Sequence, residues 1–127
     1  MKQKLIIKGK LLSLNEYINA ERSNKFMAAK LKREETEKVA WECKAQKIKP
    51  VKKIDEAFFY YYHDRRGDYD NLESTQKFFW DGLKEAGIIE NDTQEFTPKV
   101  RTHIHEFSKT PKLIIELITY EGKDISH

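Results

Sequence analysis

The fold is decided by residues 54–87, IDEAFFYYYHDRRGDYDNLESTQKFFWDGLKEAG. Residues 54–63 are rich in aromatic side chains and run into a polar segment, a pattern that predicts a β-strand ending in a loop. Residues 71–86 repeat apolar side chains at helical spacing, and Gly87 is a favourable residue just beyond a helix C-terminus. The stretch therefore predicts a strand, a polar loop and a helix in succession.

The residues before this stretch predict a strand and a long helical segment. Residues 2–12 are compatible with a strand, and Ser13 and Glu16 have the spacing of a capping box, which begins a helix. The helical pattern continues to about residue 48, with a break near residues 23–24. Its apolar positions recur at near-helical spacing: Met27, Leu31, Val39 and Cys43.

The residues after it predict two further strands. These strands cover residues 100–107 and 112–120, and a turn at residues 108–111 would join them as a hairpin. The predicted order is strand, helix, strand, helix, strand, strand, within one domain of 127 residues. Such an order predicts an α+β fold, in which helices pack on a small mixed sheet.

The charge of the chain is unevenly distributed. The net charge is +3, but residues 1–53 hold 15 basic and 6 acidic residues, whereas residues 54–127 hold 9 and 15. A basic half suits a polyanionic partner, although a solvated helix face rich in lysine is the commoner cause. Four lysines around Pro50 are either a solvated loop or contacts to phosphate groups: Lys47, Lys49, Lys52 and Lys53.

The composition also bears on the cellular location. The apolar run at residues 5–7 is too short for a signal peptide, and no apolar stretch is long enough to span a membrane. A cytoplasmic protein is therefore expected. Cys43 is the single cysteine, so we expect a partly buried structural thiol and not a disulfide or a thiolate zinc site.

Three acidic residues are candidate metal ligands. Asp68 and Asp70 lie between the predicted strand and the predicted helix, and Asp92 lies in a turn after that helix. Carboxylates gathered there would suit a hard divalent cation. Each also has a simpler explanation: Asp70 could be a helix N-cap with Glu73 in an Asp-x-x-Glu pattern, and Asp92 an ordinary turn residue. Capping does not explain a second acid at Asp68, which adds repulsion that a cation would relieve.

These residues fall in an ordered set that resembles RusA-type Holliday junction resolvases, which are crossover junction endodeoxyribonucleases. The matching segments are Gly67-Asp68-Tyr69-Asp70-Asn71-Leu72, Lys77 with Asp81-Gly82-Leu83, Ala86-Gly87, and Asn91-Asp92, together with Ser13-Leu14-Asn15 near the N-terminus. Many members place the lysine four residues after the second aspartate, where this chain has Ser74. Here Lys77 lies seven residues after Asp70, which fits a branch with about one extra helical turn.

The resemblance implies a Mg²⁺-dependent endonuclease that resolves four-way DNA junctions, with Mn²⁺ as a possible substitute. It assigns the metal to Asp68, Asp70 and Asp92, and it makes Lys77 a catalytic residue that offsets developing charge. Arg65 and Arg66, with the lysines of the first half, would bind backbone phosphates. The resemblance also implies a homodimer, often of phage or prophage origin, acting in the bacterial cytoplasm on branched DNA.

The residues alone leave several alternatives open. Lys77 and Asp81 could be a surface i, i+4 salt bridge, and Asp70 and Lys77 would share a face of one continuous helix. His103 and His105 are expected to be surface histidines on a strand, and the aromatic run 58–62 to have one buried face. The rival functions are a non-catalytic DNA-binding protein on the same scaffold, another metal-dependent phosphoesterase, and an assembly factor. Material for a dimer interface is expected on the last two strands: Ile104, Phe107, Leu113, Ile115 and Leu117.

Overall fold

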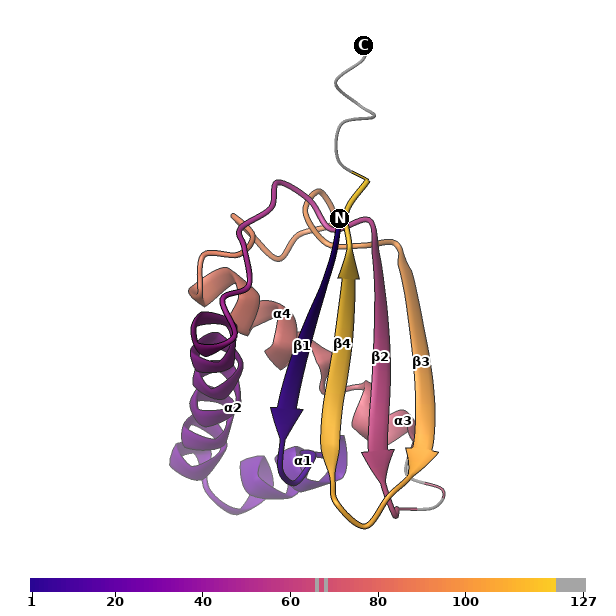
Figure 1. Cartoon of the computed structure of the whole chain (residues 1–127). Helices are drawn as coiled ribbons and strands as arrows, with labels where there is room; N and C mark the ends of the chain where they lie inside the picture. Colours follow the sequence, from indigo (N-terminus) through magenta and orange to yellow (C-terminus); the bar gives the residue numbers. More distant parts are fainter. Residues whose placement is uncertain (66, 68, 121–127) are drawn as a thin grey trace.

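A computed structural model describes residues 1–65, 67 and 69–120 of the chain. Its four-stranded sheet has the order β1 (Lys2–Lys8), β4 (Lys112–Ile118), β2 (Glu56–His63) and β3 (Val100–Phe107) (Figure 1). β4 is antiparallel to both of its neighbours, whereas β3 is parallel to β2. The sheet is mixed and the helices pack against it, so the predicted α+β class is confirmed.

The predicted hairpin of the last two strands is wrong. β3 and β4 follow one another in the chain, but β2 lies between them in the sheet. The turn at residues 108–111 crosses the end of β2, where the Ser108 amide donates to the His63 carbonyl at 2.9 Å. The more polar β3 takes the edge of the sheet, whereas β4, whose Ile115 and Leu117 are 0% and 2% exposed, lies between two strands.

The first helical segment is divided where the sequence predicts. α1 (Leu14–Ser23) begins with the expected capping box: Ser13 Oγ accepts from the Glu16 amide at 3.2 Å, and Glu16 Oε1 accepts from the Ser13 amide at 2.9 Å. α2 (Lys25–Ala45) begins anew, because Asn24 Oδ1 accepts from the Phe26 amide at 2.8 Å. Side-chain caps thus set the boundary between the two helices.

The helix predicted at residues 71–86 is two helices, α3 (Tyr69–Glu73) and α4 (Gln76–Glu85). Two hydroxyls bond to main-chain carbonyls at the break: Ser74 Oγ to Asp70 O and Thr75 Oγ1 to Leu72 O, both at 2.7 Å. Such local bonds compete with a continuous helix. The expectation that Asp70 and Lys77 share one face over two turns of a single helix is therefore wrong.

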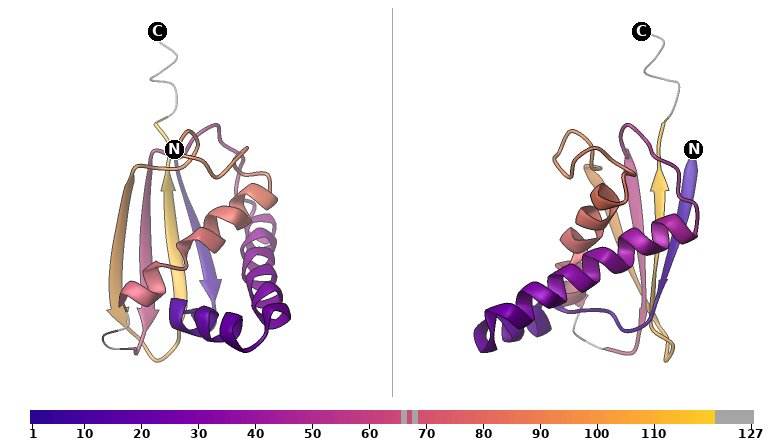
Figure 2. Two further views of the ribbon diagram at one scale, coloured as in Figure 1. Left: turned by 180° about the vertical axis from the view of Figure 1, so that it is seen from behind. Right: turned by 90° about the vertical axis from the view of Figure 1, so that its left-hand side faces the viewer.

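The core lies between the sheet and the helices, which all cover the same face (Figure 2). Phe59 of β2 is fully buried and meets Phe79 and Trp80 of α4 in edge-to-face contacts, with ring centroids 5.4 and 5.9 Å apart. α4 crosses α2 closely at Gly82, where a Cβ atom would lie 2.5 Å from Val39 Cβ. A side chain at position 82 would therefore force the two helices apart.

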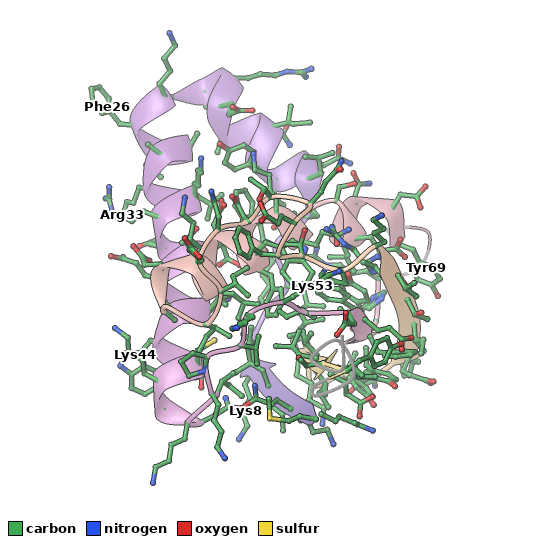
Figure 3. All side chains as sticks on the ribbon, turned by 90° about the horizontal axis from the view of Figure 1, so that it is seen from above. Lys8, Phe26, Arg33, Lys44, Lys53 and Tyr69 are labelled. Carbon is green, nitrogen blue, oxygen red and sulfur yellow. The ribbon has the colours of Figure 1, made fainter. Side chains whose placement is uncertain are left out.

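The apolar positions predicted for the long helix are only partly buried. Val39 and Cys43 belong to the core, and burial raises the pKa of the Cys43 thiol to about 12, as expected for a structural thiol. Met27 is 54% exposed, because α2 extends beyond the sheet at its N-terminal end (Figure 2). Phe26 lies at this free end of the helix and points away from the rest of the molecule (Figure 3). Within the described ranges, none of the helices is long and apolar enough to cross a membrane.

Candidate functional site

The acidic residues of the motif lie at two ends of the connection between β2 and β3. Asp70 is in α3, which follows the C-terminal end of β2 at the bottom of Figure 1. Asp92 is in the loop after α4, which lies at the top of Figure 1. Asp68 and Arg66 are outside the described residues. Among the residues that are described, no group of three or more His, Cys, Asp or Glu side chains could hold a metal ion.

Asp70 is not the N-cap that its sequence context allows. α3 begins at Tyr69, so Asp70 lies in the first turn of the helix, where a carboxylate interacts favourably with the amide dipoles. Its main-chain carbonyl accepts from both the amide and the hydroxyl of Ser74. The side chain is exposed and free to face solvent.

Two polar clusters lie along the connection between β2 and β3. We call the first the Asp92 end, and it consists of Asp81, Asp92, Lys77 and Lys84. Burial, together with the hydrogen bond and the charge of Asp92, raises the pKa of the Asp81 carboxyl. The hydrogen bond from Asp81 lowers the pKa of Asp92, with help from the charges of Lys84 and Lys77. The opposite directions of the two shifts mean that Asp81 holds a proton more strongly than Asp92 does. Lys77 is exposed and its charge favours the ionised form of both acids, so it serves more than the single i, i+4 pair with Asp81.

The predicted lysine cluster lies near this end of the molecule. Lys47, Lys49, Lys52 and Lys53 are all exposed in the segment between α2 and β2. Two main-chain hydrogen bonds join this segment to residues 86–99: the Val51 amide donates to Ile88 O at 2.9 Å, and the Ile54 amide to Phe96 O at 3.0 Å. The fold therefore brings the cluster to the loop that carries Asp92, although about 40 residues separate them in the chain.

The second cluster, the His63 end, consists of His63, Arg65, Tyr69, Glu73 and His105. The Arg65 amide donates to His63 Nδ1 at 3.1 Å, His63 Nε2 lies 2.9 Å from His105 Nδ1, and His105 Nε2 lies 2.6 Å from Glu73 Oε2. The Arg65 amide can only donate, so His63 Nδ1 must accept. This fixes which nitrogen of each following ring donates and which accepts. In this network His63 Nε2 donates to His105 Nδ1, and His105 Nε2 donates to Glu73 Oε2.

Aromatic rings also pack against the His63 end. Tyr69 of α3 stacks on His105 with ring centroids 4.0 Å apart, and Tyr61 stacks on its ring at 4.6 Å. The His105 side chain is only 7% exposed, so the expectation of a surface histidine is wrong. His103 is half-buried beside Tyr61, whose hydroxyl lies 2.8 Å from its Nδ1, and desolvation lowers the His103 pKa.

Arg65 has a structural partner at the His63 end. Its Nη1 lies 3.2 Å from Glu16 Oε1, and Lys10 Nζ lies 2.7 Å from the other oxygen of the same carboxylate. Burial alone would raise the pKa of Glu16, but hydrogen bonds from Lys10, Ser13 and Arg65 lower it to about 2. Arg65 therefore ties the loop after β2 to the start of α1, whether or not it also contacts phosphate.

A cavity of ≈ 250 Å³ opens beside this cluster. It is lined by His63, Asp64, Arg65, Tyr69, Glu106 and Phe107. Tyr69 and Phe107 are 45% and 67% exposed, so the mouth of the cavity presents aromatic surface to solvent. The cavity adjoins α3, because Tyr69 of that helix is one of its lining residues.

Reasoning from the sequence missed three of these side chains. His63 continues the alternating buried series of β2, Ala57, Phe59 and Tyr61, and that alternation could have placed it facing the helices. Glu73 and Asp81 gave no such signal, because their partners lie 32 and 11 residues away in the chain. No family model matches the chain, and no curated protein matches it.

Proposed function

We propose that the protein is a Mg²⁺-dependent endodeoxyribonuclease selective for four-way DNA junctions, which acts in recombination and repair. The observation that carries this proposal is the ordered set from Gly67 to Asp92, with its resemblance to RusA-type resolvases. The proposal includes a homodimer and a setting in the bacterial cytoplasm, with a phage or prophage origin.

The donor chemistry of the motif suits the metal. Asp68, Asp70 and Asp92 offer carboxylate oxygens, the ligands that Mg²⁺ takes from proteins. A bound Mg²⁺ would lower the pKa of a water molecule and polarise the phosphate. Lys77, whose charge already acts on Asp81 and Asp92, would offset negative charge that develops on the phosphate.

The surrounding structure supports two further roles. The hydrogen-bonded chain from Arg65 to Glu73 joins the end of β2, through His105 of β3, to the last residue of α3. A ligand carried on the loop between these elements needs this support to keep its geometry. The lysine cluster beside the Asp92 loop is exposed and supplies positive charge suited to backbone phosphates.

One observation favours a second candidate function, a DNA-binding protein on the same scaffold that does not cleave. α4 lies between Asp70 and Asp92 in the chain, and among the described residues no group of three or more His, Cys, Asp or Glu side chains could hold a metal ion. A chain that uses only its basic surface would need no shared site.

A cleavage assay separates the two candidates. Four-way junction, linear duplex and RNA substrates are incubated with and without Mg²⁺, with the wild type, Asp70→Asn and Asp64→Asn. Asp64 is exposed in the same loop but outside the motif, which makes it the matched control. We expect Mg²⁺-dependent cleavage of the junction alone, lost in Asp70→Asn and kept in Asp64→Asn. Junction binding without cleavage by the wild type would establish the non-catalytic alternative.

A further inference from the structure

A cavity of ≈ 370 Å³ lies at the start of β3, and we call it the Arg101 pocket. The residues that line it belong to the end of the Asp92 loop and the start of the strand: Gln94, Thr97, Pro98, Lys99 and Arg101. Two of them are cations, and none of these described lining residues is acidic. The pocket therefore gathers positive charge in the acid-rich half of the chain, at residues outside the resolvase-like motif.

The guanidinium group of Arg101 is held in place by two neutral acceptors and an aromatic ring. Its Nε donates to the Pro98 carbonyl at 2.9 Å, and its Nη1 donates to Gln76 Oε1 at 3.1 Å. The guanidinium carbon lies 4.9 Å from the centre of the ring of Trp80, a residue that is 4% exposed. A long side chain that is already ordered gives up less conformational entropy when it binds a ligand. Arg101 is therefore prepared for binding.

These contacts orient Arg101 without neutralising its charge. Partial desolvation lowers the pKa of Arg101, whereas a neighbouring carboxylate would raise it. Arg65 is the opposite case, because its Nη1 lies 3.2 Å from a carboxylate oxygen of Glu16. A guanidinium has five N–H groups, and within the described part of the chain the hydrogen bonds of Arg101 use two and leave three. An anion in the pocket would both compensate the charge and accept from these groups.

The wall of the Arg101 pocket is a folded loop. The Thr93 carbonyl accepts from the amides of Phe96 and Thr97 at 3.0 and 3.1 Å, and from Thr97 Oγ1 at 3.0 Å. The Ile54 amide donates to Phe96 O at 3.0 Å, which ties this loop to the segment before β2. Thr97 itself is 3% exposed. The pocket is therefore formed by the fold itself, as small-ligand sites usually are.

We propose that the Arg101 pocket binds a phosphate group, with Arg101 as the planar donor and Lys99 as a second positive charge. A guanidinium edge matches two phosphate oxygens, and hydrogen bonds between charged partners are about twice as strong as neutral ones. In the proposed function this group belongs to the DNA backbone, and for that source the inference rests on the proposed function. A free phosphate ion has the same chemistry, so the site itself can be tested without DNA.

Side-chain NMR spectroscopy of the full chain tests the site, with inorganic phosphate as the probe. We expect saturable shifts of the Arg101 Nε–H signal and of the Trp80 indole N–H signal, because this indole also donates to Gln76 Oε1. The indole N–H of Trp41, which is 67% exposed on α2, is the internal reference and should not move. Chloride at the same ionic strength is the control ion and should move none of the three signals.

Substitutions separate the site from general electrostatics. Arg101→Gln should raise the phosphate dissociation constant at least about tenfold, since hydrogen bonds to a charged group are lost. Arg101→Lys should also bind weakly, because it keeps the charge but not the planar fork. Arg22→Gln is the matched control, as it removes the same charge from the exposed last turn of α1 and should bind like the wild type. If Arg101→Gln does not fold, Lys99→Gln at an exposed position takes its place.

Fluorescence anisotropy with four-way junction DNA in EDTA identifies the source of the phosphate, because binding is then measured without cleavage. Arg101→Gln should flatten the plot of log affinity against log salt by about 0.9, and Arg22→Gln should leave it unchanged. An unchanged slope in Arg101→Gln, beside saturable phosphate shifts, would overturn the DNA source and assign the pocket to a free phosphate.

Two results would overturn the site itself: phosphate shifts that do not saturate, or an Arg22→Gln variant that loses as much phosphate affinity as Arg101→Gln. Saturable phosphate binding by a chain that does not bind DNA would refute the proposed function and leave the site standing. Failure of junction cleavage in Mg²⁺, with both binding results as expected, would refute the nuclease alone.

Discussion

The His63 end and the Asp92 end of the β2–β3 connection are built on different principles. At the His63 end, one amide, two imidazoles and a carboxylate form an unbroken chain in which every donor has an acceptor. At the Asp92 end, two hydrogen-bonded carboxyls whose pKa values are shifted in opposite directions lie among exposed lysines. The first arrangement fixes position, and the second concentrates charge. A metal site that uses Asp70 and Asp92 together would need both properties, and α4 lies between them.

The largest expected effect is a loss of junction cleavage when Asp70, beside the His63 end, loses its charge. Asp70→Asn should lower the rate of junction cleavage by about a hundredfold or more while binding remains, because several kcal/mol of charge stabilisation by the metal are lost. The substitution also weakens the dipole interaction in the first turn of α3, by about 0.3–1 kcal/mol, which urea denaturation would detect. Single-turnover cleavage in Mg²⁺ is the measurement, and wild-type rates in this variant would remove Asp70 from the site.

Asp92→Asn is the matching variant at the other end. An equal loss of cleavage would mean that both ends serve one site. Full activity in Asp92→Asn beside an inactive Asp70→Asn would confine the metal to the His63 end.

Salt dependence shows which end binds the DNA backbone. Neutralising Lys47, Lys49, Lys52 and Lys53 to Gln should flatten the plot of log affinity against log salt by about 0.9 for each lost phosphate contact. Arg65→Gln should change it by about 0.9 or less, because Arg65 is already paired with Glu16. Fluorescence anisotropy over a series of salt concentrations measures both slopes. An unchanged slope in the quadruple variant would move the DNA surface away from the Asp92 end.

A smaller effect measures the rigidity of the His63 end. His105→Ala removes two links at once and leaves His63 and Glu73 without their shared partner, which should cost about 1–3 kcal/mol of unfolding free energy. Lys109→Ala is the control, because this side chain is exposed in the turn after the same strand and should stay within about 0.5 kcal/mol of the wild type. Urea denaturation compares the two variants, and equal stabilities would show that the hydrogen-bonded chain contributes nothing to the free energy of unfolding.

The smallest expected effect is the pH dependence of stability that arises from the shifted pKa values of Asp81 and Asp92. Because the folded-state pKa of Asp81 is raised, its ionised form destabilises the fold, and stability is lost as the pH rises through that pKa. Asp92 is the opposite case, since its pKa is lowered and its stabilising effect is lost as the pH falls through that value.

Asp81→Asn tests this assignment, because the amide donates to Asp92 at every pH. Near neutral pH we expect a gain in unfolding free energy of less than about 1 kcal/mol, as both groups are partly solvated. The gain should vanish in acid, below the usual carboxyl value of 3.8, where Asp81 is protonated in both states. Urea midpoints at the two pH values measure it, and a loss of stability at neutral pH would reverse the assignment.

Most of the secondary structure could be predicted, because its signals are local. The capping box of Ser13 and Glu16 and the cap at Asn24 lie within three residues of the groups they satisfy. The break at residues 74–75 was missed, since hydroxyls that bond to the preceding turn have no signature in apolar spacing. Of the candidate site, the sequence predicted the acids and the lysines but not their partners.

The sequence by itself determined where strands and helices lie, where most of them begin, and which residues carry the resolvase-like motif. The tertiary structure decided that β4 enters the sheet beside β2, which face of the sheet stays open, and that His105 joins His63 and Glu73 in one chain. The physical reason is the range of the interactions. Periodicity and caps act over a few residues, whereas strand order and buried polar chains depend on which surfaces pack together once distant segments meet.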